Sequence, residues 1–271
     1  MELPYAQSIP ESGFDFSNYQ RNKTLLEGSG STPPRCTSTG TTIVGVLFKD
    51  GVILGTDTRA TGGPMVHDKN CQKLHYMAPN IYCAGAGTAA DCDHTTEMVK
   101  RDLELHRLTT GQPSRVNMCV NKLSHHLFKY MGHCGTALII GGFDVKGPQL
   151  CEVDPHGYTA YNPFLTMGSG SLAAMAILET EYKDDMTEEE AVTLVTRAIE
   201  AGIYHDLGSG SNVDIGIIKK DGLTMKRSLK SDNHKIFTNP NGYDFPSGTT
   251  EVLKTKKIPL VVSEGAQPME L

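Results

Sequence analysis

Residues 42–56 read Thr-Ile-Val-Gly-Val-Leu-Phe-Lys-Asp-Gly-Val-Ile-Leu-Gly-Thr. Two runs rich in β-branched residues flank Lys49-Asp50-Gly51, and Asp-Gly is a favoured connection in β-hairpins. The stretch therefore predicts an antiparallel hairpin. Patterns of the same kind predict further strands over residues 74–77, 81–84, 137–142, 149–153, 161–167, 213–219 and 223–229.

Pairs of helical patterns separate these groups of strands. One covers about 89–108, and the next has an apolar stripe at helical spacing from Val116 to Tyr130. Another helix is expected over 172–182, and Thr187-Glu-Glu-Glu190 has the capping-box pattern that opens a helix. Single helices do not alternate with single strands, which argues against a parallel doubly wound sheet. Two antiparallel sheets face to face, each covered by a pair of helices, would make a four-layer αββα fold of the α+β class.

The two ends of the chain differ from this pattern. Residues 1–40 lack sustained periodicity and include Gly28-Ser-Gly-Ser-Thr-Pro-Pro34, so we expect an irregular leader. From Ser231 the chain is again irregular, and it then reads as extended over 252–262.

Composition limits the class of protein. The 271 residues include 25 Lys plus Arg and 31 Asp plus Glu, a net charge of −6 that argues against a nucleic-acid or anionic-membrane partner. No apolar run approaches the roughly 18 residues that span a bilayer, and the N-terminus lacks a secretory signal pattern. Seven cysteines without a C-x-x-C pair indicate free thiols in a reducing compartment. We expect no metal and no cofactor.

A glycine precedes the first strand's two threonines. The hydroxyl of Thr41 is a weak nucleophile unless a base lies beside it. If the Gly40–Thr41 bond is cut, the new α-amino group, whose ordinary pKa is about 7.7–8.0, can take the hydroxyl proton. Gly40 would allow the backbone bend that attack on the preceding carbonyl needs. By itself the tripeptide more commonly just begins a strand.

Charged and glycine-rich motifs lie near the expected strand ends. A buried Lys73 near Thr41 would favour ionisation of the hydroxyl, and Asp57 would keep that lysine charged, although a surface ion pair is the commoner fate of such residues. The stretch Gly85–Ala90 matches G-x-G-x-x-A, a weak dinucleotide fingerprint, or it offers a helix N-terminal N–H to an oxyanion.

The tetrapeptide Gly-Ser-Gly-Ser occurs twice, at 168–171 and 208–211. Both copies lie beside apolar helical stripes, which favours tight turns over flexible linkers. Asp206 could orient Ser169 or Ser209. A Ser-His-Asp hydrolase is weakly supported, because no G-x-S-x-G elbow accompanies a usable histidine.

Taken in order, these motifs resemble the catalytic beta subunits of the eukaryotic 20S proteasome, of the trypsin-like class. The resemblance covers about 13–253 and keeps the spacing between motifs. It implies the αββα sandwich of N-terminal nucleophile hydrolases. It also implies a threonine endopeptidase that cuts unfolded or ubiquitin-targeted proteins after basic residues. The motifs are Thr41-Thr-Ile-Val-Gly-Val, Gly55-Thr-Asp-Thr-Arg59, Asp68-Lys-Asn-Cys-Gln-Lys73, Gly85-Ala-Gly-Thr-Ala-Ala-Asp91, Met167-Gly-Ser-Gly-Ser171 and Asp206-Leu-Gly-Ser-Gly-Ser211.

The resemblance implies a role for each matching segment. Residues 1–40 would be a propeptide removed by autocatalytic cleavage at Gly40–Thr41, and 41–230 the hydrolase core. Residues 231–271 would be a C-terminal extension and arm contacting a neighbouring subunit. Thr41 would be the nucleophile. Asp57 and Lys73 would tune and orient it. Ser169, Asp206 and Ser209 would complete the surrounding hydrogen-bond network, and the amide of Gly87 would form the oxyanion hole.

The resemblance also implies a substrate site made of Gly85, Thr61 and Asp93. Gly85 would leave room for a long substrate side chain, and Asp93 would offer a carboxylate to its Lys or Arg head group. Asp91 is the weaker candidate for that carboxylate. Both acids also suit a helix start, where the helix dipole favours negative charge whatever the function.

Partners follow from the same resemblance. We expect other proteasome alpha and beta subunits in a four-ring core particle of twenty-eight subunits, assembly chaperones, a regulatory particle and polypeptide substrates, in the cytoplasm and nucleus. Two other functions stay open. A non-catalytic ring subunit would not need Thr41, Asp57 and Lys73 together, and a nucleotide-dependent oxidoreductase would be built on Gly85–Ala90.

Overall fold

The computed structural model describes residues 17–29, 39–230, 242, 246, 248 and 251–259. The chain forms two units, Met1–Ser231 and Asp232–Leu271. Every residue of the candidate site belongs to the first unit. The described part of the second unit contains no helix or strand.

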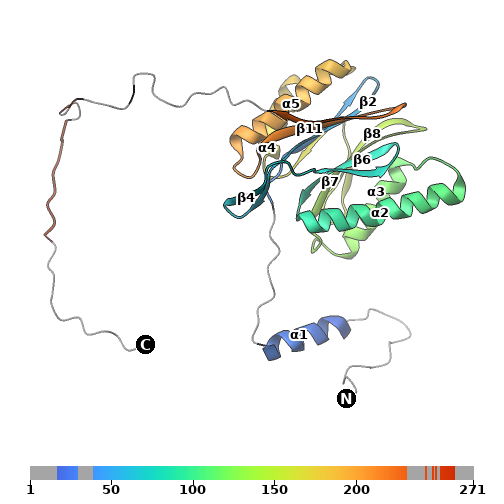
Figure 1. The fold of residues 1–271 in the computed structure, drawn as a ribbon, viewed down its shortest axis with the longest axis horizontal. Coiled ribbons are helices and arrows are strands. Elements are labelled where there is room, and N and C mark those ends of the chain that lie inside the picture. Colours follow the sequence, from blue (N-terminus) through green and yellow to red (C-terminus); the bar gives the residue numbers. More distant parts are fainter. Residues whose placement is uncertain are drawn as a thin grey trace. The chain divides into compact units, whose positions relative to one another are not determined.

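Two antiparallel five-stranded sheets form the centre of the first unit (Figure 1). In the first sheet the strand order is β10 (Phe164–Met167), β1 (Ile43–Phe48), β2 (Gly51–Asp57), β11 (Asn212–Lys219) and β12 (Gly222–Lys230). In the second it is β5 (Leu74–Ala78), β6 (Ile81–Gly87), β7 (Thr136–Asp144), β8 (Gly147–Val153) and β9 (Thr159–Tyr161). A separate two-stranded sheet pairs β3 (Ala60–Gly62) with β4 (Met65–Asp68).

Helices cover the outer face of each large sheet. One apolar cluster packs α4 (Ser171–Glu181) and α5 (Glu188–His205) on the first sheet, and another packs α2 (Ala89–Thr110) and α3 (Val116–Lys129) on the second. A third cluster lies between the sheets, where Ile43 and Leu54 meet Ile139 and Leu150. The predicted four-layer αββα fold is confirmed.

The predicted hairpin is β1–β2, with Phe48 opposite Gly51 across the turn. Its side chains alternate between two buried faces: Val46 and Ile53 point to the helices, whereas Ile43 and Leu54 point to the other sheet. Burial on both faces explains why the hairpin reads as a continuous apolar run instead of an apolar–polar alternation.

One predicted strand is wrong. The run 161–167 is divided into the end of β9 and the whole of β10, which belong to different sheets. Pro163 lies between them, and its missing N–H cannot take part in a ladder. Its carbonyl instead accepts the backbone N–H of Leu47 at 2.8 Å, so the chain changes sheets at this residue.

The leader also differs from the expected irregular segment, because residues Ser17–Ser29 form the helix α1. Fewer than half of its residues are good helix formers and it has no apolar stripe, so neither propensity nor periodicity reveals it. Its one described ion pair joins Lys23 to Glu27 at 4.0 Å, one helical turn apart. The rest of the expected leader, 1–16 and 30–38, lies outside the described residues.

Among the described residues, no helix has the length and apolar character needed to cross a membrane. Six of the seven cysteines are described, and all six are free thiols, as expected. Cys83, Cys92, Cys119 and Cys151 are buried, whereas Cys71 and Cys134 are half-buried.

Candidate active site

The β1–β2 hairpin positions the first two residues of the site. Because Ile43 pairs with Thr56, the residues just outside that pair, Thr42 and Asp57, also lie side by side, and the Asp57 N–H donates to the Thr42 carbonyl at 3.1 Å. Lys73 immediately precedes β5 of the other sheet. The site therefore forms where the open end of the hairpin meets the second sheet.

A single ammonium group connects these residues. The Lys73 Nζ donates to Asp57 Oδ1 at 2.7 Å, to Thr41 Oγ1 at 3.0 Å and to the Gly40 carbonyl at 3.2 Å. An ammonium has three N–H groups, so all of them are used. Lys73 thereby touches both the hydroxyl and the carbonyl of the peptide bond that precedes it.

Asp57 is fully buried, yet its carboxylate has many partners. Besides Lys73 it accepts the backbone N–H groups of Thr42 at 3.0 Å, Arg59 at 3.2 Å and Gly210 at 3.0 Å. A buried ion pair is tolerated only when such extra hydrogen bonds offset its desolvation. The pair of Asp57 and Lys73 is thus buried, not the surface ion pair that such residues more often form.

Two serines and one acid lie on the other side of Thr41. The Thr41 N–H donates to Ser169 Oγ at 3.0 Å, and Ser169 Oγ donates to Asp206 Oδ2 at 2.6 Å. Ser209 Oγ donates to the same oxygen at 2.6 Å and accepts the Thr42 hydroxyl, also at 2.6 Å. The structure therefore brings together every residue that the sequence placed in this network.

The carboxylate of Asp206 is stabilised as an anion. Partial burial raises its pKa, but hydrogen bonds from Ser169 and Ser209 and from the Gly208 amide outweigh burial, and the pKa falls below its usual value. Asp206 stays ionised at neutral pH and acts as an acceptor for both hydroxyls.

The two residues before Thr41 lie along the site as a short extended segment. The Thr39 N–H and hydroxyl both donate to the Gly87 carbonyl, at 3.3 and 3.1 Å. The Gly40 N–H donates to Thr61 Oγ1 at 3.1 Å. Thr61, expected to bind substrate, thus holds the chain's own segment.

Gly40 is required here for a different reason from the one expected. Its φ is not in the positive region, so no unusual bend depends on it. A Cβ built on Gly40 would instead lie 2.1 Å from Gly208 Cα, far inside van der Waals contact. The absent side chain lets two backbone segments meet beside Thr41.

A pocket of about 70 Å³ opens beside Thr41 and Lys73. Its lining includes three residues expected from the sequence: Gly85, Gly87 and Asp93. Asp91 is not part of it, because its carboxylate accepts the Gly135 N–H at 2.9 Å. Sequence reasoning missed the remaining lining residues, which are Thr39, Ala60, Cys71, Gln72, His75, Ala89 and Cys92.

The backbone of Gly135 packs against the glycine-rich turn after β6 and fills the space beside it. Gly87 has a φ of 119°, and a Cβ there would lie 2.2 Å from the Gly135 carbonyl oxygen. That oxygen accepts the Thr88 N–H at 2.8 Å, at the start of α2. Strand β6 pairs antiparallel with both neighbours, so the βαβ unit of a dinucleotide site is absent from this part of the fold.

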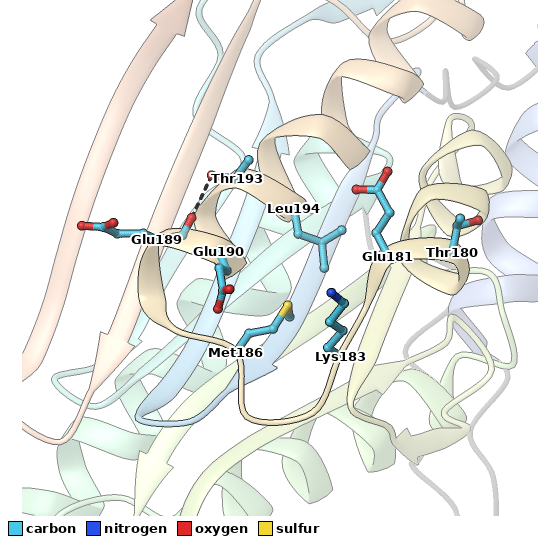
Figure 2. A pocket seen from close by; sticks show the side chains of 8 residues that line it. All are labelled: Thr180, Glu181, Lys183, Met186, Glu189, Glu190, Thr193 and Leu194. Carbon is cyan, nitrogen blue, oxygen red and sulfur yellow. Dashed lines mark hydrogen bonds between the residues drawn. The ribbon is translucent and has the colours of Figure 1, made fainter.

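A second pocket, of about 560 Å³, lies at the junction of α4 and α5 (Figure 2). Its threonines are tied to the helices: the Thr193 hydroxyl donates to the Glu189 carbonyl at 2.8 Å. Two of its three acids are also engaged, since Glu181 pairs with Arg197 at 2.6 Å and Glu190 closes the capping box with Thr187. Both lining threonines, Thr180 and Thr193, donate their hydroxyls to helix carbonyls, so neither is activated by a neighbouring base.

Comparison with known proteins identifies the family of the chain. The family model described as "Proteasome subunit" matches residues 37–218. The chain belongs to the proteasome subunit family. It is 52% identical over 254 residues to proteasome subunit beta type-7 of Dictyostelium discoideum, covering 94% of this chain and 95% of that protein.

Other relatives are similar over nearly their whole length. Proteasome subunit beta type-2 of Saccharomyces cerevisiae is 49% identical over 245 residues, 90% of this chain and 93% of that protein. Proteasome subunit beta type-10 of Mus musculus is 46% identical over 266 residues, 97% of each chain. The family expected from the motifs is confirmed, and membership implies assembly with other proteasome subunits.

Proposed function

We propose that this chain is the precursor of a threonine endopeptidase subunit of a 20S proteasome core, with Thr41 as nucleophile and a preference for cleavage after basic residues. The observation that carries the proposal is the position of Thr41 Oγ1, 3.0 Å from a buried ammonium that is itself 2.7 Å from a buried carboxylate. A non-catalytic ring subunit would have no use for this costly buried pair.

The contacts around Gly40 support self-cleavage. Its carbonyl accepts both the Thr41 hydroxyl, at 2.6 Å, and Lys73, so it is polarised toward attack. Attack by Thr41 Oγ on the Gly40 carbonyl carbon forms an ester while the C–N bond breaks and the nitrogen gains a proton. Water then hydrolyses the ester, which releases residues 1–40 and leaves Thr41 with a free α-amino group.

In the mature chain that α-amino group would act as the base. It would sit where the Thr41 amide now contacts Ser169, whose hydroxyl is held by the ionised Asp206. It would accept the Thr41 hydroxyl proton during attack on a substrate carbonyl and return it to the leaving amine. Gly87 lines the pocket beside Thr41, and its amide would bind the oxyanion.

The preference for basic residues is proposed from the pocket beside Thr41. Gly85 contributes no side chain to its wall, and Asp93 contributes a carboxylate. A Lys or Arg side chain that reaches Asp93 would form a charge-assisted hydrogen bond. Thr61 would hold the substrate backbone as it now holds the Gly40 N–H.

The ends of the chain have proposed roles as well. Residues 1–40 would be the propeptide, 41–230 the hydrolase core and 231–271 an arm against a neighbouring subunit. In the described stretch 251–259, Val252, Leu253 and Ile258 are exposed, which suits a segment covered by another chain. The particle would contain other alpha and beta subunits in four rings and would act in the cytoplasm and nucleus.

The mass and N-terminal sequence of the chain in assembled particles test this function. We expect the chain to begin at Thr41, because only cleavage there supplies the α-amino base. We also expect the particles to hydrolyse peptides after arginine. A chain that still carries residues before Thr41 in fully assembled particles would contradict the catalytic proposal and leave a purely structural subunit.

Replacing Gly40 with alanine is expected to slow release of the leader by about 10²-fold. The new Cβ would clash with Gly208 and move the carbonyl of residue 40 away from the Thr41 hydroxyl. Western blots of precursor and mature chain over time measure this. Gly28→Ala is the matched control in the same leader, since no atom lies within 4 Å of a Cβ built there. A chain produced to start directly at Thr41 lacks residue 40 and needs no processing, so it should have full peptidase activity. Normal processing of Gly40→Ala would show that the contact with Gly208 does not position the bond.

A further inference from the structure

The pocket beside Thr41 has a histidine in its wall that the proposed mechanism does not use. His75 lies on β5, two residues beyond Lys73, so both side chains are on the same face of the strand. A Cβ built on Gly85 would lie 3.1 Å from His75 Nε2 and 3.4 Å from Cys92 Cβ. The imidazole therefore borders the space that the missing side chain of Gly85 leaves open.

The other ring nitrogen of His75 faces the acid of the pocket. His75 Nδ1 is 3.6 Å from Asp93 Oδ1, which is too long for a hydrogen bond but close enough for a charge interaction if the ring is protonated. The His75 side chain is 18% exposed and that of Asp93 is 71% exposed. The carboxylate thus reaches solvent and an incoming ligand, while the imidazole stays behind it.

The surroundings of His75 favour its neutral form at pH 7. Burial lowers its pKa below the usual value of 6.5, even though Asp93 and Glu97 on α2 raise it. From the segment before β5, Lys73 and Cys71 line the same pocket. The charge of Lys73 is paired with Asp57, and burial raises the pKa of the Cys71 thiol. Asp93 and Glu97 are therefore the anions that a protonated His75 would meet.

We propose that His75 is a specificity-determining residue of this pocket: the neutral imidazole leaves the Asp93 carboxylate available to a basic substrate side chain, whereas the imidazolium pairs with that carboxylate and repels the substrate cation. The inference rests on the proposed preference for basic residues. It adds that the preference is lost in mild acid, because two cations compete for one carboxylate.

A matched pair of peptide substrates tests this on intact particles. One peptide has arginine at the cleaved position and the other citrulline, which is nearly isosteric but uncharged. The ratio of their kcat/KM values isolates recognition of the charge, because titration of the Thr41 amine affects both peptides. Activity of particles with Thr41→Ala is subtracted to remove cleavage by other subunits.

We expect this ratio to fall at least roughly threefold between pH 7.5 and pH 5.0, since an imidazolium near a bound cation is strongly unfavourable. In His75→Gln and His75→Asn particles the ratio should stay constant over this range. In Asp93→Asn particles it should be low at every pH.

Each outcome separates the two proposals. A ratio near one for the unmodified particle at pH 7.5 would contradict the preference for basic residues itself. A high ratio that does not change with pH would leave that preference intact and overturn the role of His75. So would a pH dependence that both glutamine and asparagine at position 75 retain. If neither variant assembles, the profile of the unmodified particle still decides, because a constant ratio contradicts the proposal.

Discussion

Replacing Thr41 with alanine is expected to leave the Gly40–Thr41 bond uncut and to abolish this subunit's cleavage after arginine. The Thr41 hydroxyl is the group that lies against both the Gly40 carbonyl and Lys73, and the variant removes it while keeping the backbone. Loss of a nucleophile costs on the order of 10⁶-fold in protease turnover, which is below detection here. Mass spectrometry of the chain and hydrolysis of an arginine peptide by purified particles measure both effects.

Thr41→Ser is the matched control. It keeps the hydroxyl and the amine and removes only a methyl group, so we expect processing at Gly40–Thr41 and measurable, reduced peptide cleavage. Particles with Thr41→Ala that still release the leader would contradict autocatalysis at this residue. Particles with Thr41→Ala that still cleave after arginine at the normal rate would assign that activity to another subunit.

Local sequence patterns predicted the fold well where the local preference of a segment matches the structure that it adopts in the folded chain. The capping box of Thr187 and Glu190 is present at the start of α5, and the Asp-Gly turn closes β1–β2. The four layers follow because each hairpin strand has apolar residues on both faces, which requires cover on both sides. Because the strands pair antiparallel and the helices come in pairs along the chain, few other ways of stacking the layers are possible.

The prediction failed where tertiary contacts override local pattern. The run 161–167 reads as one strand, but Pro163 cannot join a ladder, so the chain passes from one sheet to the other. The short strands β3 and β4 were not expected; they are only three and four residues long, and Gly63 and Pro64 form the turn between them. Helix α1 has no apolar face, and periodicity detects only helices that have one.

The candidate site shows the same division. Ordered motifs were enough to expect that Thr41, Asp57 and Lys73 would meet, and they do meet. The contact of Gly40 with Gly208 joins residues far apart in the chain, so the local sequence around either glycine does not predict it. His75 had a usable signal, because it follows Lys73 by two residues in a predicted strand and so shares its face.

Replacing Lys73 with methionine is expected to block release of the leader and, in chains made to start at Thr41, to lower cleavage after arginine by about 10³-fold. Methionine has nearly the length of lysine but no charge, so Thr41 Oγ1 and the Gly40 carbonyl each lose the donor that polarises them. Removing one partner of a buried ion pair also costs about 3–5 kcal/mol of stability. Asp57 keeps three backbone N–H donors, which should limit that cost and allow assembly.

Lys73→Arg separates charge from geometry. Arginine keeps the positive charge, but its planar guanidinium cannot place one nitrogen within 3.2 Å of the Asp57 carboxylate, the Thr41 hydroxyl and the Gly40 carbonyl together. We expect assembled particles with near-normal thermal stability and activity still reduced by about 10²-fold. Kinetics on chains made to start at Thr41 measure the effect apart from processing. Full activity of Lys73→Met in such chains would reduce Lys73 to a structural partner of Asp57, whereas full activity of the arginine variant alone would assign its role to charge.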